Sequence, residues 1–320
     1  MSVTQTSTQV SHLRSFYDRL LLVRLLPHLM HAMFAQVKDV PLNNTNVIKF
    51  RRYNSLSLAT TALTPGVTPS TAALTVTDIS ATLSQYGNVI ETSDELLDTT
   101  EDQYRNEITR LLAENAGQSL DQICRDVLVA GSSVQYASTA SSRVTVSSTM
   151  KMTLAEAREA VRTLKTNNAR KITSMVNPTT GIDTIPLNSC FVGICHPNTT
   201  FDLKADSAFV PVENYPNQSD VMPGEVGKLD EIRFIETTYA KVFTAAGASG
   251  IDVYATLILA ADAYGVSRLS GRAMETISKP LGSAGTADAL NQRATEAWKA
   301  WFVTKILQDL AMLRIEHAVS

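Results

Sequence analysis

The spacing of apolar residues predicts long helices in the first part of the chain. Between Val10 and Val37 apolar side chains recur at helical spacing, and Pro27 should kink or split that helix. A longer helix is predicted over residues 93–130, because Thr92 and Glu95 have the spacing of a capping box and Gly131 follows the last apolar position. At 1.5 Å per residue such a helix would span about 57 Å, so it is expected to act as a strut.

Two strand-like runs with an uncharged segment between them predict a long β-hairpin. Residues 46–53 alternate in the manner of a strand, and a second run covers residues 74–90. Pro65-Gly66 lies between the runs and is typical of a turn. From residue 54 to residue 93 the only charges are Asp78 and Glu91. A two-stranded ribbon is marginally stable alone. The hairpin is therefore expected either to be part of a sheet of its own domain or to lie against another surface.

The second half of the chain is predicted to be rich in strands. Thr153 and Glu156 form another capping box, which opens a helix that runs to about Leu164. The change to β-rich sequence over 172–274 marks a predicted domain boundary. Residues 290–310 fit both helical and strand spacing, and this alternative stays open. The predicted strands are residues 143–148, 185–196, 232–235, 253–260 and 312–317.

Charge is scarce and unevenly placed. Charged residues make up 18% of the 320 positions, below the ~25% of ordinary soluble domains. The deficit lies in residues 54–93, 130–150, 172–201 and 237–261. This pattern suits Ser/Thr-covered sheets, surfaces buried against other subunits, or both. The net charge of −3 argues against a dedicated nucleic-acid binder.

The first 53 residues carry seven Lys or Arg against two Asp, so they form a basic arm. The arm is either solvated, or laid on an acidic partner or on nucleic acid. Because its apolar stripe needs a partner, deletion of residues 1–40 is expected to leave the core folded and to impair assembly.

Targeting signals and disulfides are not expected. The N-terminus lacks the basic and apolar regions of a signal peptide, and the apolar stretch 20–33 is interrupted and too short to span a membrane. Three cysteines, at 124, 190 and 195, favour a reducing compartment. The sequence therefore predicts a soluble intracellular protein, or one packaged from an intracellular pool, with no membrane partner.

Candidate chemistry is sparse. The stretch Gly224 to Lys228 resembles part of a phosphate loop, but Met222 and Leu229 stand where that loop needs Gly and Ser or Thr, so a turn entering the strand at 232 is expected. The acidic residues from 94 to 102 are expected to be a capped, solvated helix start. Cys190, Cys195 and His196 are the candidates for a metal site, although alternation places Cys195 and His196 on opposite faces of a strand.

Five stretches, taken in order, resemble a known family. They are Leu63-Thr-Pro-Gly-Val-Thr-Pro69, residues 223–237 (Pro-Gly-Glu-Val-Gly-Lys-Leu-Asp-Glu-Ile-Arg-Phe-Ile-Glu-Thr), residues 290–299, residues 260–265 and Arg314-Ile-Glu316. With the arm, hairpin and strut helix, they resemble the major capsid proteins of tailed phages with the Hong Kong 97-type fold. Within that fold they are similar to the family of the coliphage N-four coat protein. Ala289 departs from the pattern, where Pro is expected before Leu290.

The resemblance implies an α+β fold of four parts. These are an N-terminal arm (1–44), an extended loop (45–91), a peripheral domain with a long spine helix (92–175 and 275–320) and a β-rich axial domain (176–274). It implies a virion shell of many copies in hexamers and pentamers, assembled in the bacterial cytoplasm around double-stranded DNA that is contacted non-specifically. Scaffold, portal and decoration proteins are further expected partners. No enzyme activity and no cofactor are implied.

Subunit contacts are expected along the arm, the hairpin and the helix start. Because residues 54–73 contain no Lys, covalent crosslinking from the hairpin tip is not expected. The alternatives are a cellular nanocompartment shell of the same fold and a metal-dependent enzyme that uses Cys190, Cys195 and His196. The candidate contact residues are Arg14, Arg19, Arg24, Arg51, Arg52, Thr64, Pro65, Gly66, Val67, Asp94 and Glu95.

Overall fold

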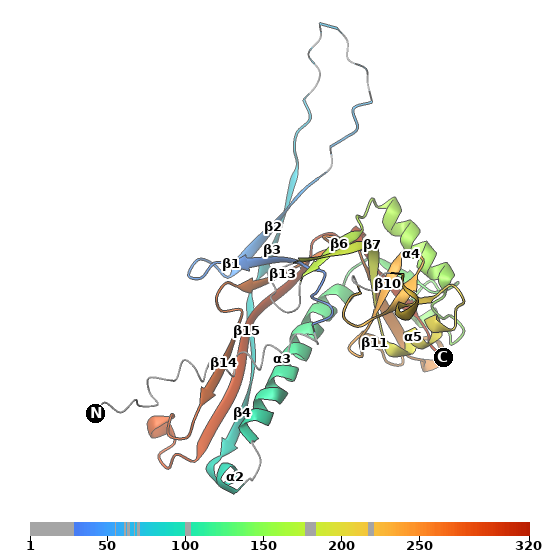
Figure 1. The fold of residues 1–320 in the computed structure, drawn as a ribbon. Coiled ribbons are helices and arrows are strands. Elements are labelled where there is room, and N and C mark those ends of the chain that lie inside the picture. Colours follow the sequence, from blue (N-terminus) through green and yellow to red (C-terminus); the bar gives the residue numbers. More distant parts are fainter. Residues whose placement is uncertain are drawn as a thin grey trace.

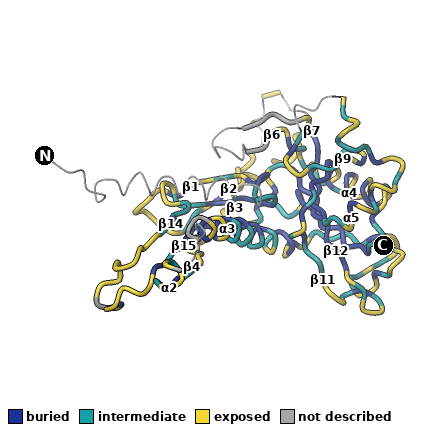
Figure 2. The backbone as a smooth tube through the Cα atoms, turned by 60° about the horizontal axis from the view of Figure 1, so that its bottom comes forward, coloured by how far each residue is buried: buried dark blue, intermediate teal, exposed yellow. Residues whose placement is uncertain are grey.

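The computed structural model has a compact body, an elongated part beside it and a hairpin that rises away from both (Figure 1). It describes residues 29–54, 56–60, 62, 65, 66, 68, 71–99, 104–176, 184–216 and 221–320. Buried residues are concentrated in the compact body and where a long helix lies on the elongated sheet (Figure 2).

A nine-stranded sheet forms the centre of the compact body. Its central strands are mostly apolar, and all seven residues of Val253–Leu259, Thr256 included, are buried, as expected for a strand that is covered on both faces. The strands predicted at 185–196, 232–235, 253–260 and 312–317 are confirmed. The sheet order is β5 (Val134–Tyr136), β16 (Met312–His317), β12 (Val253–Leu259), β7 (Thr184–Cys195), β10 (Ile232–Glu236), β9 (Glu225–Leu229) and β8 (Val210–Pro211), with β11 (Val242–Phe243) on β12 and β6 (Ile172–Val176) on β7.

Two helices belong to the body, α4 (Leu154–Thr166) and α5 (Pro197–Lys204). The predicted capping box of α4 is confirmed, since the Thr153 backbone N–H donates to the Glu156 carboxylate at 3.0 Å. Ala157, Ala160, Val161 and Leu164 then form one buried face of the helix, which packs against β16.

A five-stranded sheet forms the elongated part. Residues 293–306 form a strand, which settles the alternative between helix and strand for 290–310. Along this strand the residues from Ala294 to Thr304 alternate between buried and half-buried, as strand geometry requires. The sheet order is β1 (Gln36–Val40), β13 (Tyr264–Leu269), β15 (Arg293–Ile306) and β14 (Met274–Lys279), with β4 (Ser84–Ser93) also on β15.

The long helix lies along one face of this sheet (Figure 1). The prediction of one helix over 93–130 needs correction, and so does its cap. Thr92 is a residue of β4, and its hydroxyl donates to the Ala294 carbonyl at 3.3 Å, because the ladder with β15 continues to the end of β4. Ser93 takes the capping position instead, and its hydroxyl accepts from the Leu96 N–H at 3.3 Å. The helical segments are α2 (Asp94–Thr99) and α3 (Tyr104–Val129).

The predicted hairpin is confirmed over β2 (Val47–Tyr53) and β3 (Val76–Thr82), which pair antiparallel, but the second predicted run, 74–90, extends into β4, which pairs with β15 instead. These strands pair only with each other among the described strands. Gly66 has φ +81° at the predicted Pro-Gly turn, a conformation that glycine adopts without strain. A single residue, Leu83, separates β3 from β4, so the hairpin continues directly into the elongated sheet.

Two local predictions were wrong. Residues 143–148 are not a strand, because Arg143–Thr145 is a single 3-10 turn whose Thr145 hydroxyl donates to the Ser142 carbonyl at 2.8 Å. The segment after Gly224 is also not a plain turn. It forms β9, and the chain reverses into β10 at Asp230, which has φ +55°.

The described end of the arm is part of the core. The helix predicted through Val37 is wrong for the described residues 29–37, which form turns as far as residue 35 and then β1, a strand that pairs in parallel with β13. His31, Met33 and Phe34 are buried. The His31 backbone N–H donates to one Asp121 carboxylate oxygen, and the ring Nδ1 lies 2.7 Å from the other. The rest of the predicted arm helix lies outside the described residues.

Candidate subunit-interaction surfaces

The hairpin exposes apolar side chains beyond its base. Leu58 is 88% exposed, and Leu56 and Leu74 are exposed on either side of the turn. Tyr53 and Val76, which face each other at the end of the ladder, are exposed as well. Because a ribbon of two strands has no interior of its own, these side chains need an external surface to become buried.

The predicted interface residues of the hairpin divide into root and tip. Arg51 forms an exposed ion pair with Asp78 across the two strands, with 3.0 Å between Nε and Oδ1. Arg52 instead reaches the end of the elongated part, where its Nη1 donates to the Leu307 carbonyl at 3.2 Å. At the tip, Pro65 and Gly66 are exposed. Thr64, Val67, Arg14, Arg19 and Arg24 lie outside the described residues.

The acidic candidates lie at the far end of the elongated part, in α2 (Figure 1). Asp94 is half-buried, and its Oδ1 accepts the Glu95 backbone N–H at 2.8 Å. Glu95 is exposed. Both carboxylates stand in the first turn, where the free N–H groups of a helix favour negative charge. The capped helix start expected from the sequence therefore accounts for them.

A second apolar surface, which the sequence did not reveal, is the sheet face turned away from α3. Trp298 and its alternate neighbours on β15 are buried toward the helix, where the indole Nε1 donates to Asn115 Oδ1 at 3.2 Å. The opposite face presents Val89, Ala297 and Ile277 side by side on three strands, because Ala297 is paired with both of the others. Val89 is 59% exposed. We call these three residues the apolar row.

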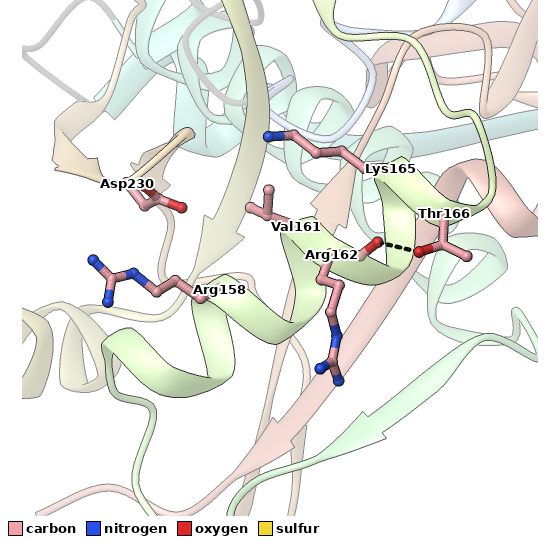
Figure 3. Close-up of a pocket in the computed structure, with 6 residues that line it drawn as sticks. All are labelled: Arg158, Val161, Arg162, Lys165, Thr166 and Asp230. Atoms are coloured by element: carbon pink, nitrogen blue, oxygen red, sulfur yellow. Dashed lines mark hydrogen bonds between the residues drawn. The ribbon is translucent and has the colours of Figure 1, made fainter.

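A basic pocket of about 510 Å³ lies on the outer face of α4 (Figure 3). Arg158, Arg162 and Lys165 line it, together with Asp230 from the turn before β10. The three cationic groups point in different directions and do not meet at one point (Figure 3). Arg162 and Lys165 are also paired with Glu159 and Glu231. The pocket is therefore a charged surface without convergent ligand contacts.

The structure does not assemble the candidate metal site. Cys190 and Cys195 are buried in β7, where burial raises the pKa of the Cys195 thiol to about 12 and that of Cys190 to about 11. His196 caps α5, and its Nδ1 accepts the Asn198 N–H at 3.2 Å. Within the described ranges no three His, Cys, Asp or Glu residues are placed to hold a metal ion. None of the helices described there is long and apolar enough to cross a membrane.

Comparisons with known proteins point to one kind of molecule. The family described as "Phage capsid protein" matches residues 57–315. The chain is similar in structure to the capsid of Ralstonia phage GP4, with a TM-score of 0.70 at 12% identity over 90% of this chain and 87% of that one. The head of Helicobacter pylori bacteriophage KHP40 gives 0.65 at 13% identity, over 89% and 87%. The cyanophage Pam1 capsid gives 0.64 at 14%, over 92% of both.

These similarities confirm the predicted α+β fold of the Hong Kong 97 type. No curated protein matches the chain in sequence. The narrower resemblance to the coliphage N-four coat protein stays a prediction.

Proposed function

Because this chain belongs to the phage capsid protein family, we propose that it is the major capsid protein of a tailed phage, whose copies associate non-covalently as hexamers and pentamers of an icosahedral shell. Its place is the virion capsid. Its family and fold are those of a structural protein rather than of an enzyme.

The observation that carries this proposal is the uncovered hairpin. It rises from the rest of the subunit (Figure 1), and Leu56, Leu58 and Leu74 stay exposed on it. Burying one such side chain in a contact contributes about 1.5–3 kcal/mol of transfer free energy. We propose that contributions of this kind, repeated in every subunit, hold the shell without covalent bonds.

A neighbouring copy offers a matching surface in the apolar row. Val89, Ala297 and Ile277 form a strip across three strands, with the Lys299–Glu275 ion pair beside it. We propose that the hairpin of one subunit lies over this face of the next. Because the residues beyond the hairpin base carry no charge, this contact should depend little on salt.

We further propose a division into domains. The hairpin is the extended loop, and the nine-stranded sheet with α4 and α5 forms the axial domain at the centre of a capsomer. The five-stranded sheet with α3 forms the peripheral domain. Sheet membership supports assigning β13 to the peripheral part and β5 and β16 to the axial part, which shifts the sequence-based boundaries at 92–175, 176–274 and 275–320.

Electron microscopy of the purified protein tests the proposal, alone and with its scaffold. We expect closed shells or capsomer rings. A protein that stays monomeric under every assembly condition would contradict it. A matched variant replaces residues 55–74 with Asn-Gly, which joins Asn54 to Thr75 by a two-residue turn and so keeps the register of the β2–β3 ladder while it removes Leu56, Leu58 and Leu74. We expect this variant to fold and to remain unassembled, because the exposed leucines are the attachment surface.

The content of purified particles tests whether the shell encloses double-stranded DNA. We propose that the shell is filled with double-stranded DNA in the bacterial cytoplasm, with scaffold, portal and decoration proteins as associates. Particles from infected cells should contain nuclease-protected DNA, measured by absorbance after nuclease treatment. Protein cargo in place of DNA would indicate a nanocompartment of the same fold.

A further inference from the structure

The hairpin is attached to the elongated part through a small apolar joint. Phe50 is 3% exposed and packs in a cluster with Ala81 and Leu307 that is separate from the main core. Ile48 and Ile79 lie at its edge. The ring also has the Lys38 ammonium 5.5 Å from its centroid, which adds a cation–π contact from β1. One aromatic ring is therefore the centre of the attachment.

Gly265 of β13 makes room for this ring. A Cβ atom built on Gly265 would lie 2.7 and 2.8 Å from two carbons of the Phe50 ring, closer than carbon atoms pack. Gly265 has no positive φ, so the backbone conformation does not require glycine here. The reason for glycine is the close approach of the ring.

Apart from this apolar joint, the chain itself connects the hairpin to the elongated sheet, since Leu83 links β3 directly to β4. At this joint a described hydrogen bond runs from Arg52 Nη1 of the hairpin to the Leu307 carbonyl, which directly follows β15 of the elongated part. A groove of about 580 Å³ runs beside it and is lined by Phe50, Ile79 and Leu307 among others. Residues 50–65 reach about 50 Å when extended, so a tilt of about 10° at the root moves the tip by about 9 Å.

We propose that Phe50 and Gly265 are positioning residues that set the angle at which the hairpin leaves the subunit, and thereby where its tip meets the neighbour. This inference rests on the proposed function, because the angle matters only if the hairpin joins subunits. A different angle changes the orientation of adjacent copies, and shell diameter depends on that orientation.

The test is Gly265→Ala, assembled with wild-type scaffold and imaged by electron microscopy. The added methyl group displaces the Phe50 ring, so we expect loss of shells of wild-type diameter in favour of other diameters or open sheets. Phe50→Leu in the Gly265→Ala background removes ring atoms that clash. It should shift the diameter distribution back toward wild type. Phe50→Ala alone, which removes the ring without crowding the core, should broaden the distribution.

The matched control is Gly193→Ala in the nine-stranded sheet. There a Cβ atom would lie 2.8 Å from the Phe234 ring, a similar clash in the body rather than at the joint. Gly193→Ala should lower the melting temperature of the subunit without changing the diameter of the shells that form. If Gly265→Ala behaves in the same way, or forms wild-type shells, the inference is overturned. If wild-type protein forms no shells, the proposed function itself fails.

Discussion

The buried polar residues Asp121 and His31 connect parts of this subunit that are distant along the chain. Asp121 of α3 is fully buried and holds both the backbone N–H and the ring of His31. The His31 carbonyl in turn accepts from the Tyr264 hydroxyl of β13 and, at 3.4 Å, from the Cys124 thiol. One residue of the arm is thus bonded to the spine helix and to the elongated sheet. The contact fixes where the arm enters the fold.

Replacing Asp121 with Ala should therefore destabilise the subunit. The change leaves the His31 N–H and ring without their buried acceptor, and breaking a buried pair in this way costs about 3 kcal/mol. Urea unfolding of the unassembled subunit measures the loss. Asp126→Ala on the same helix is the control, because Asp126 is exposed and its pairing with Arg125 contributes about 1 kcal/mol or less. Equal effects of the two variants would contradict the assigned role of Asp121.

A second residue-scale prediction concerns pH. Burial lowers the pKa of His317 from 6.5 to about 4. Its Nε2 lies 2.9 Å from the Thr256 hydroxyl and its Nδ1 2.9 Å from the Ala318 carbonyl, and the ring stacks on Tyr254. The negative charges of Asp202 and Glu156 act in the opposite direction and raise the pKa of His317, but burial is the larger effect. Between pH 6.5 and 4 the unfolded histidine binds a proton that the folded one does not. The unfolded state is then favoured as the pH falls.

We expect the contribution of His317 to be fully present above pH 6.5 and to decrease by about 3 kcal/mol toward pH 4. Urea unfolding across this range measures the slope. His317→Gln removes the titrating group and should flatten the slope. His196, whose pKa is also lowered by burial, leaves a residual slope of the same sign. An unchanged slope in the variant would mean that other groups cause the acid sensitivity.

At the scale of elements, β15 shows why a segment can fit two periodicities. Trp298 and Trp301 are three residues apart, so on a helix they share a face and on a strand they lie on opposite faces. The structure places Trp298 toward α3 and Trp301 on the other side of the sheet, half-buried. The surrounding strands decide between the two alternatives, because β4 pairs with ten consecutive residues of β15.

Replacing each of the two tryptophans with Ala should accordingly lower the free energy of unfolding by a different amount. Trp298→Ala removes a side chain that is 3% exposed and is expected to cost about 3–5 kcal/mol in unfolding free energy. Trp301→Ala should cost about 1–2 kcal/mol in the unassembled subunit, because the ring is only partly removed from water there. Denaturant titration of both variants checks the ranking. Equal losses would fit a helix better than the observed strand.

At the scale of the whole molecule, the structure changes how much of the N-terminal arm can be deleted without unfolding the subunit. Residues 31–40 supply the His31 contact, strand β1 and three side chains of the main core, those of Met33, Phe34 and Ala35. Deleting residues 1–40, which on sequence grounds should spare the core, is therefore expected to unfold the subunit. Deleting only residues 1–28 should leave a cooperatively unfolding protein with impaired assembly. Circular dichroism melts and electron microscopy of the two truncations separate these outcomes. Two equally stable truncations would contradict the assignment of residues 31–40 to the core.

The sequence by itself determined the local elements and the resemblance to capsid proteins. The α4 capping box, the Pro65-Gly66 turn and the buried strands are set by residues close together along the chain, so local pattern was sufficient. Tertiary structure alone decided that residues 293–306 form a strand, that residues 36–40 pair with β13, and that His31 meets Asp121. It also decided that Phe50 fills the space left by Gly265. Each of these features depends on a partner that is 90 or more residues away along the chain. The hydrophobic pattern of one segment carries no information about which distant segment will pack or pair with it.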